Sequence, residues 1–151
     1  MLALAAARLG LKTHIYSDED NAPAFQVSAF RTHARYDNEA ALAAFAGACD
    51  VVTFEFENVP SATAEFLADH VPVNPSPKAL AVCQDRLAEK NFVASLGLKT
   101  PVFASVASPN DAAAAIATVG TPAILKTCRL GYDGKGQAKV ASSDEIVKAL
   151  A

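Results

Sequence analysis

Short apolar runs alternate with helical segments through the first half of the chain. We expect them in the order helix 1–9, strand 12–16, edge strand 30–34, helix 39–46, strand 51–56, helix 61–69 and strand 71–74. Because strands that alternate with helices pair in parallel, this order predicts an α/β domain with an open parallel sheet and flanking helices. A unit of this kind begins with a strand, whereas the chain opens in a helix, so we expect the first strand to be missing.

The second half of the chain has a different order of elements. We expect one or two helices over 78–96, an extended segment from Thr100, and then helix 109–119, strand 122–127, strand 138–141 and helix 143–151. We place the domain boundary between residues 97 and 108, which gives domains 1–100 and 101–151. A domain of about 45 residues seldom folds stably by itself, so we expect the second domain to be incomplete at its end.

A glycine-rich segment joins the last two expected strands. A lysine ends the first of these strands, and the residues around it that suit an anion are Lys126, Arg129, Gly131, Gly134, Lys135 and Gly136. Glycines let backbone N–H groups approach a phosphate, and cations supply the matching charge. The order Gly-x-x-Gly-x-Gly matches neither a P-loop nor a dinucleotide fingerprint. An ordinary hairpin tip is the alternative, but a lysine in an apolar strand favours phosphate binding.

Composition excludes several classes of function. A net charge of −3, from 13 basic and 16 acidic residues, provides no basic field for nucleic acid. Three cysteines (Cys49, Cys83 and Cys128) lie far apart, which favours a reducing compartment and argues against a zinc site. No apolar run approaches the roughly 20 residues of a membrane span. We therefore expect a cytoplasmic protein whose partners are neither nucleic acid nor membrane.

Lys126 followed by 131–137, Gly-Tyr-Asp-Gly-Lys-Gly-Gln, resembles the nucleotide-binding hairpin of the ATP-grasp ligases. The sequence of this motif is most similar to that of the 5-(carboxyamino)imidazole ribonucleotide synthases of purine biosynthesis. The resemblance extends from Met1 to the end of the chain. It implies a pre-ATP-grasp domain that lacks its first strand and glycine-rich turn, followed by the start of an α+β ATP-grasp domain.

The resemblance also implies an activity. In this family ATP phosphorylates bicarbonate to carboxyphosphate, and the carboxyl group passes to the amine of 5-aminoimidazole ribonucleotide, with release of ADP and phosphate. It implies ATP and Mg²⁺ as cofactors and suggests a homodimer. The family's Mg²⁺ carboxylates belong to segments beyond Ala151, so no metal ligand or catalytic residue is assigned and the chain alone is expected to be inactive. The alternatives are another ATP-grasp ligase, such as a formate-dependent glycinamide ribonucleotide transformylase, and a non-catalytic nucleotide-binding module.

Two groups of site residues follow from the resemblance. The expected ATP ligands are Arg86, in the motif Gln84-Asp85-Arg86, together with Lys126, Gly131, Tyr132, Asp133, Gly134, Lys135, Gly136 and Gln137. The expected substrate-side residues are Glu55, Glu57 and Asn58, at the end of strand 51–56, where ligands of α/β sheets collect. Residues two apart on a strand point to one side, so both carboxylates should face the ligand. The alternatives are an ion pair of Arg86 within its helix and a loop that caps the helix at Ser61.

Overall fold

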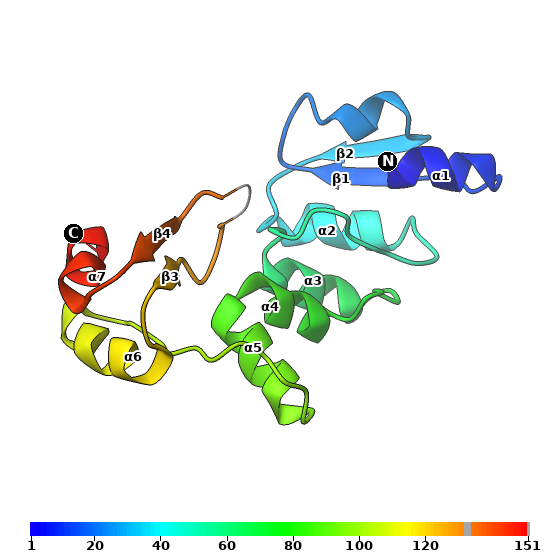
Figure 1. Ribbon diagram of the computed structural model, residues 1–151. Coiled ribbons are helices and arrows are strands. Elements are labelled where there is room, and N and C mark those ends of the chain that lie inside the picture. The colour runs from blue at the N-terminus through cyan, green and yellow to red at the C-terminus, as the bar shows by residue number, and fades with distance from the viewer. Residues whose placement is uncertain (132–133, 151) are drawn as a thin grey trace. The chain divides into compact units, whose positions relative to one another are not determined.

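The computed structural model describes residues 1–131 and 134–150 (Figure 1). The chain forms two compact units, Met1–Ala81 and Val82–Ala151. In the described ranges, no helix has the length and apolar character needed to cross a membrane. The division into domains 1–100 and 101–151 remains a prediction about independently folding parts.

The first unit combines a small parallel sheet with helices. Its elements are α1 Leu2–Arg8, β1 His14–Ser17, the 3₁₀ helix η1 Pro23–Gln26, β2 Phe30–His33, α2 Glu39–Ala46, α3 Ser61–Ala68 and the first residues of α4 Pro77–Gln84. Strands β1 and β2 pair in parallel, from His14 opposite Phe30 to Ser17 opposite His33. The parallel sheet predicted from the alternation of elements is therefore confirmed.

The prediction of regular strands at 51–56 and 71–74 is wrong. In their place, Val52 and Val73 form an isolated parallel bridge. The Val52 N–H donates to the Pro72 carbonyl and the Asn74 N–H donates to the Val52 carbonyl, each at 2.9 Å. Pro72 has no N–H group to donate to the carbonyl of Asp50, so the ladder cannot extend on that side of the bridge.

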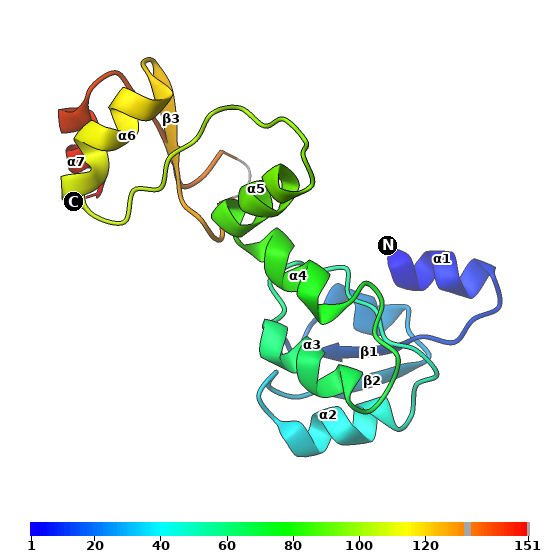
Figure 2. The same ribbon diagram turned by 90° about the horizontal axis from the view of Figure 1, so that it is seen from below.

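The core of the first unit lies between α2, α3 and the bridged residues. The two helices lie side by side (Figures 1 and 2). The buried side chains are Leu42, Phe45, Ala46, Val52, Leu67, Val71 and Val73. Helix α2 begins where predicted, because the Asn38 side chain accepts a 3.1 Å hydrogen bond from the Ala41 N–H and satisfies a free donor of the first turn.

The second unit places an antiparallel hairpin against two helices. Its elements are the end of α4, α5 Arg86–Ser95, the 3₁₀ helix η2 Pro109–Asp111, α6 Ala112–Val119, β3 Ala123–Lys126, β4 Gln137–Val140 and α7 Ser143–Leu150. Pairing runs from Ala123 opposite Val140 to Lys126 opposite Gln137. Helices α6 and α7 lie side by side (Figure 2) and enclose Ala112, Val140 and Ile146.

Two local features of the second unit refine the predictions. Residues 78–96 form two helices because Asp85 caps α5, with its carboxylate accepting hydrogen bonds from the Leu87 and Ala88 N–H groups, each at 2.9 Å. Strand β3 is not buried on both faces as expected: alternate residues are exposed, among them Lys126. The part of the hairpin that the structure describes is covered by helices on one face, which explains this alternation.

Candidate functional site

The loop that joins β3 to β4 is closed at its base by backbone and side-chain contacts of Thr127. The Thr127 N–H donates a 2.8 Å hydrogen bond to the Gly136 carbonyl. A Cβ atom added to Gly131 would lie 2.7 Å from the Thr127 Oγ1, and one added to Gly136 would lie 2.6 Å from it. Gly136 also has φ +65°, in the left-handed region that favours glycine. The close approach of Thr127 therefore requires glycine at both positions, and the backbone requires it at Gly136 as well.

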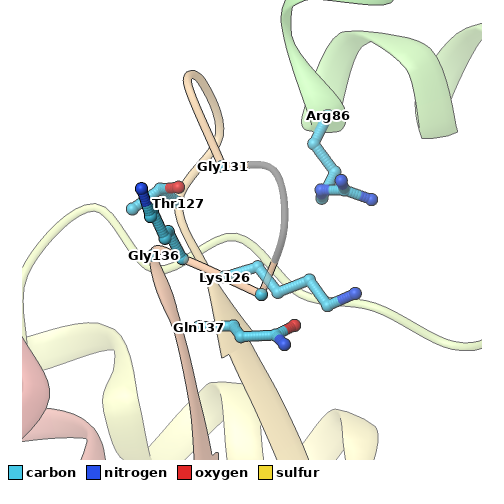
Figure 3. A pocket seen from close by; sticks show the side chains of 8 residues that line it. Arg86, Lys126, Thr127, Gly131, Gly136 and Gln137 are labelled. Carbon is cyan, nitrogen blue, oxygen red and sulfur yellow. The ribbon is translucent and has the colours of Figure 1, made fainter.

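A pocket of ≈180 Å³ opens beside this loop. Its lining residues are Arg86, Lys126, Thr127, Gly131, Gly134, Lys135, Gly136 and Gln137. In Figure 3 the side chains of Arg86, Lys126 and Gln137 reach into the same space. The lining includes three cations, and none of the described lining residues is acidic. Such a pocket attracts an anion.

Arg86 comes to the pocket from a distant part of the chain. It is the first residue of α5, and its N–H donates a 2.9 Å hydrogen bond to the Cys128 carbonyl. Within the described ranges, no ion pair closer than 4.0 Å joins Arg86 to Glu89, so the alternative of pairing along the helix is not observed. The half-buried Arg86 side chain lines the pocket instead.

The structure also places the other expected ATP ligands. Lys126 ends β3 and lines the pocket, but it is exposed, so the expectation of a lysine within a buried strand is wrong. Gly131, Gly134, Lys135, Gly136 and Gln137 line the same pocket. Tyr132 and Asp133 lie outside the described residues.

The expected substrate-side residues lie in the first unit. The Glu55 carboxylate accepts a 3.3 Å hydrogen bond from the Leu2 N–H and lies 3.6 Å from the amino group of Met1. Glu57 is exposed and Asn58 is half-buried. Because 55–57 is not a regular strand, the argument that both carboxylates point to one side does not hold. The expected alternative is not observed either, since Pro60 precedes α3 and no side chain caps that helix.

Thr127 is a pocket residue that the sequence reasoning missed. Its side chain fills the space between Gly131 and Gly136. The available signal was its position directly after the strand lysine and before the glycines, where a small side chain is needed. That signal is weak, because the close approach of the two glycines follows from the closed loop and not from their spacing.

Two family models match this chain. The family model of the ribonucleotide synthetase preATP-grasp domain matches residues 1–84, more than half of the chain. The chain belongs to the ribonucleotide synthetase preATP-grasp family. The model of the ATP-grasp domain matches residues 91–151, which contain the hairpin and every pocket residue except Arg86. The predicted fold, a pre-ATP-grasp domain followed by the start of an ATP-grasp domain, is therefore confirmed.

Individual relatives point to one kind of enzyme within this preATP-grasp family. The N5-carboxyaminoimidazole ribonucleotide synthase of Brucella melitensis is 46% identical over 145 residues, 96% of this chain and 40% of that enzyme. The solved synthetase of Thermus thermophilus is 42% identical, with a TM-score of 0.88 over 99% of this chain and 40% of its own. The Staphylococcus aureus synthetase complexed with ADP is 35% identical, with a TM-score of 0.91 over 99% and 41%. The chain thus spans about two-fifths of these relatives.

Proposed function

We propose that this chain binds ATP through its second unit and takes part in the carboxylation of 5-aminoimidazole ribonucleotide in de novo purine biosynthesis. The reaction joins bicarbonate to the amine of that nucleotide, with ATP converted to ADP and phosphate. The observation that carries the proposal is the convergence of Arg86, Lys126 and Lys135 on one pocket beside a closed glycine loop. The names of the relatives supply the substrate.

The pocket suits the phosphate end of a nucleotide. Its ≈180 Å³ is below the roughly 300–1,000 Å³ of a typical small-molecule site, so it would enclose phosphate groups and not a whole nucleotide. Opposite unit charges 4 Å apart attract by about 4 kcal/mol at an effective dielectric constant near 20, typical of a protein surface. Several cations around one polyphosphate therefore provide the attraction that the site needs.

Each pocket side chain has a distinct task in this proposal. The planar guanidinium of Arg86 can hold two phosphate oxygens at once, whereas the ammonium groups of Lys126 and Lys135 act as point charges. Glycine N–H groups and the Gln137 amide add neutral donors. Phosphoryl transfer depends on positioned positive charge more than on a covalent nucleophile, so these residues bind and orient the phosphates and stabilise charge during transfer.

Magnesium is implied by the resemblance, but the residues at hand do not form a site for it. Among residues 1–131 and 134–150 there is no group of three or more His, Cys, Asp or Glu side chains that could hold a metal ion. Mg²⁺ requires octahedral oxygen ligation by carboxylates, waters and substrate phosphates. We therefore assign Mg²⁺ to no residue of this chain and derive no step through it.

Glu55, Glu57 and Asn58 are proposed to face the ribonucleotide substrate. Carboxylate and amide oxygens accept hydrogen bonds from the hydroxyl and amine groups that such a substrate carries. A homodimer and a cytoplasmic location complete the proposal. Support for the location comes from three cysteines that are free in the structure, as expected in a reducing compartment.

The decisive experiment uses a chimera in which this chain replaces part of a longer related enzyme. Residues 1–151 would replace the matching segment of the Brucella melitensis synthase, and phosphate release would be measured with and without 5-aminoimidazole ribonucleotide at fixed bicarbonate and Mg²⁺. We expect release that depends on the ribonucleotide, and its loss when Lys126→Ala is added. A folded chimera that binds ATP but shows no such dependence contradicts the carboxylation. Activity with formate and glycinamide ribonucleotide instead would establish the alternative ligase.

A further inference from the structure

Arg129 lies close to the pocket but does not line it. The Arg129 Nη2 donates a 3.0 Å hydrogen bond to the Oε1 of Gln84. Gln84 is the last residue of α4 and is only 7% exposed. The guanidinium of Arg129 is therefore directed at a buried amide of the α4–α5 junction, although its charge would suit a phosphate.

A second hydrogen bond joins the same two segments. The Arg86 N–H donates to the Cys128 carbonyl at 2.9 Å, so consecutive hairpin residues contact residues 86 and 84. The first N–H groups of a helix have no partner within the helix. In α5, Asp85 satisfies those of Leu87 and Ala88, and Cys128 satisfies that of Arg86. The start of α5 is thus completed by the base of the hairpin loop.

The backbone between Arg129 and the first glycine is strained. Leu130 has φ +59°, in the left-handed region that a branched side chain rarely adopts. Leu130 is 70% exposed, so burial of its side chain does not offset the strain. Contacts on either side hold this conformation: Arg129 bonds to Gln84, and Gly131 packs on Thr127. Strain of this kind persists only where surrounding contacts fix the backbone.

We propose that Arg129 is a positioning residue and not a phosphate ligand. Its hydrogen bond to Gln84 holds the loop base against the start of α5 and so fixes the position of the Arg86 guanidinium relative to Lys126. This inference rests on the proposed function, because the position of Arg86 relative to Lys126 matters for binding only if both residues contact phosphate. The contrasting assignment makes Arg129 one more cation that contacts the nucleotide directly.

The two assignments differ in a double-mutant cycle on chain 1–151. ATP affinity would be measured by calorimetry at low and high salt for Arg129→Ala, Gln84→Met and the double variant, with Lys148→Ala as the control for lost charge. A shared role predicts that each single change weakens binding about three- to tenfold and that the double variant is no weaker. Gln84→Met changes no charge, so it should weaken binding while keeping the salt dependence of the wild type. Additive losses, or a Gln84→Met variant that binds ATP as tightly as the wild type, would overturn the proposal.

A second measurement needs no nucleotide. Exchange of the Arg86 amide hydrogen reports the bond to Cys128, and it should become faster in Arg129→Ala and stay unchanged in Lys148→Ala. Unchanged exchange in Arg129→Ala would also overturn the proposal, and this exposed position leaves little risk of unfolding. If the wild-type chain bound no ATP, the nucleotide site of the proposed function would fail, while the exchange result would still decide whether Arg129 holds the two segments together.

Discussion

The backbone N–H of Thr127 donates a 2.8 Å hydrogen bond to the carbonyl of Gly136, one residue beyond the last pair of the β3–β4 hairpin. This bond closes the base of the glycine loop. The Thr127 side chain then occupies the space between Gly136 and Gly131, where neither position has room for a Cβ atom. The shape of the pocket therefore depends on small residues at defined positions and on the threonine between them.

Gly136→Ala should weaken ATP binding and lower the melting temperature. The new Cβ would lie 2.6 Å from the Thr127 Oγ1 and 3.0 Å from its Cγ2, at a φ of +65°. The left-handed backbone alone costs an L-residue about 1–2 kcal/mol, and the collision displaces the loop base in addition. Calorimetry with ATP and thermal unfolding of the same preparation measure the two effects.

Gly120→Ala is the matched control for that change. Gly120 also has a positive φ, +82°, but a Cβ there meets nothing within 4 Å. It should lower the melting temperature and leave ATP affinity unchanged. Adding Thr127→Ala to Gly136→Ala removes the colliding Oγ1 and Cγ2 atoms and should restore part of the affinity. Equal ATP affinity in wild type and Gly136→Ala would show that the loop base does not shape the site.

Lys126→Ala should reduce ATP affinity about ten- to a hundredfold, because a charge-assisted hydrogen bond contributes about 1.5–3 kcal/mol. The side chain is exposed at the pocket, so its removal should leave the melting temperature nearly unchanged. Lys148→Ala, an exposed lysine of α7 outside the pocket, controls for the lost charge. A variant with full ATP affinity and reduced stability would instead make Lys126 a packing residue.

Local signals predicted the helices well. Asn38 and the alanine-rich segment after it define α2. Asp85 caps α5, but that signal was not used, and the sequence left one or two helices open over 78–96. Strand pairing depends on residues far apart in sequence, which explains the error at 51–56. Its partner segment contains Pro72, which cannot donate to the preceding strand residue Asp50, and only the bridge of Val52 with Val73 forms. The proline pattern was visible in the sequence, but the pairing of Val52 with Val73 was not.

The site was predictable only in part, for a similar reason. The spacing of the glycines and Lys126 identified the loop, because these residues are neighbours in the chain. Nothing in the spacing places Arg86 beside Cys128, and its assignment came from the resemblance to a family. The contact of Arg129 with Gln84 likewise could not be predicted. From the sequence alone, a cation next to a glycine loop suggests a phosphate ligand.

Glu57→Gln, placed in the chimera with the Brucella melitensis synthase, tests the proposed substrate side. The loss of a carboxylate that accepts hydrogen bonds from the ribonucleotide should raise the KM for 5-aminoimidazole ribonucleotide about tenfold or more and leave the KM for ATP unchanged. Glu65→Gln, at an exposed position on α3, is the control. If the KM for ATP rose and that for the ribonucleotide did not, Glu57 would not belong to the substrate side.

Acidification should destabilise the second unit through Asp111. Its Oδ2 accepts hydrogen bonds from the Ser108 N–H at 2.8 Å, the Ala107 N–H at 3.0 Å and the Ser108 hydroxyl at 3.1 Å. These bonds, the backbone bond from Ser108 above all, lower the pKa of the Asp111 carboxyl below its ordinary value. Between the folded and unfolded pKa values the unfolded chain binds more protons. The stability that Asp111 contributes is therefore complete above about pH 4 and is lost as pH falls through the folded value.

Asp111→Asn should reduce stability at pH 7 and flatten the loss of stability below about pH 4, because the group that takes up the proton is gone. Urea unfolding between pH 7 and pH 3, followed through the signals of the buried Ile146 methyl groups, measures both effects in the second unit. Asp69→Asn, at the exposed end of α3 in the first unit, should leave that pH profile unchanged. The same acid dependence in Asp111→Asn as in the wild type would mean that other carboxylates determine it.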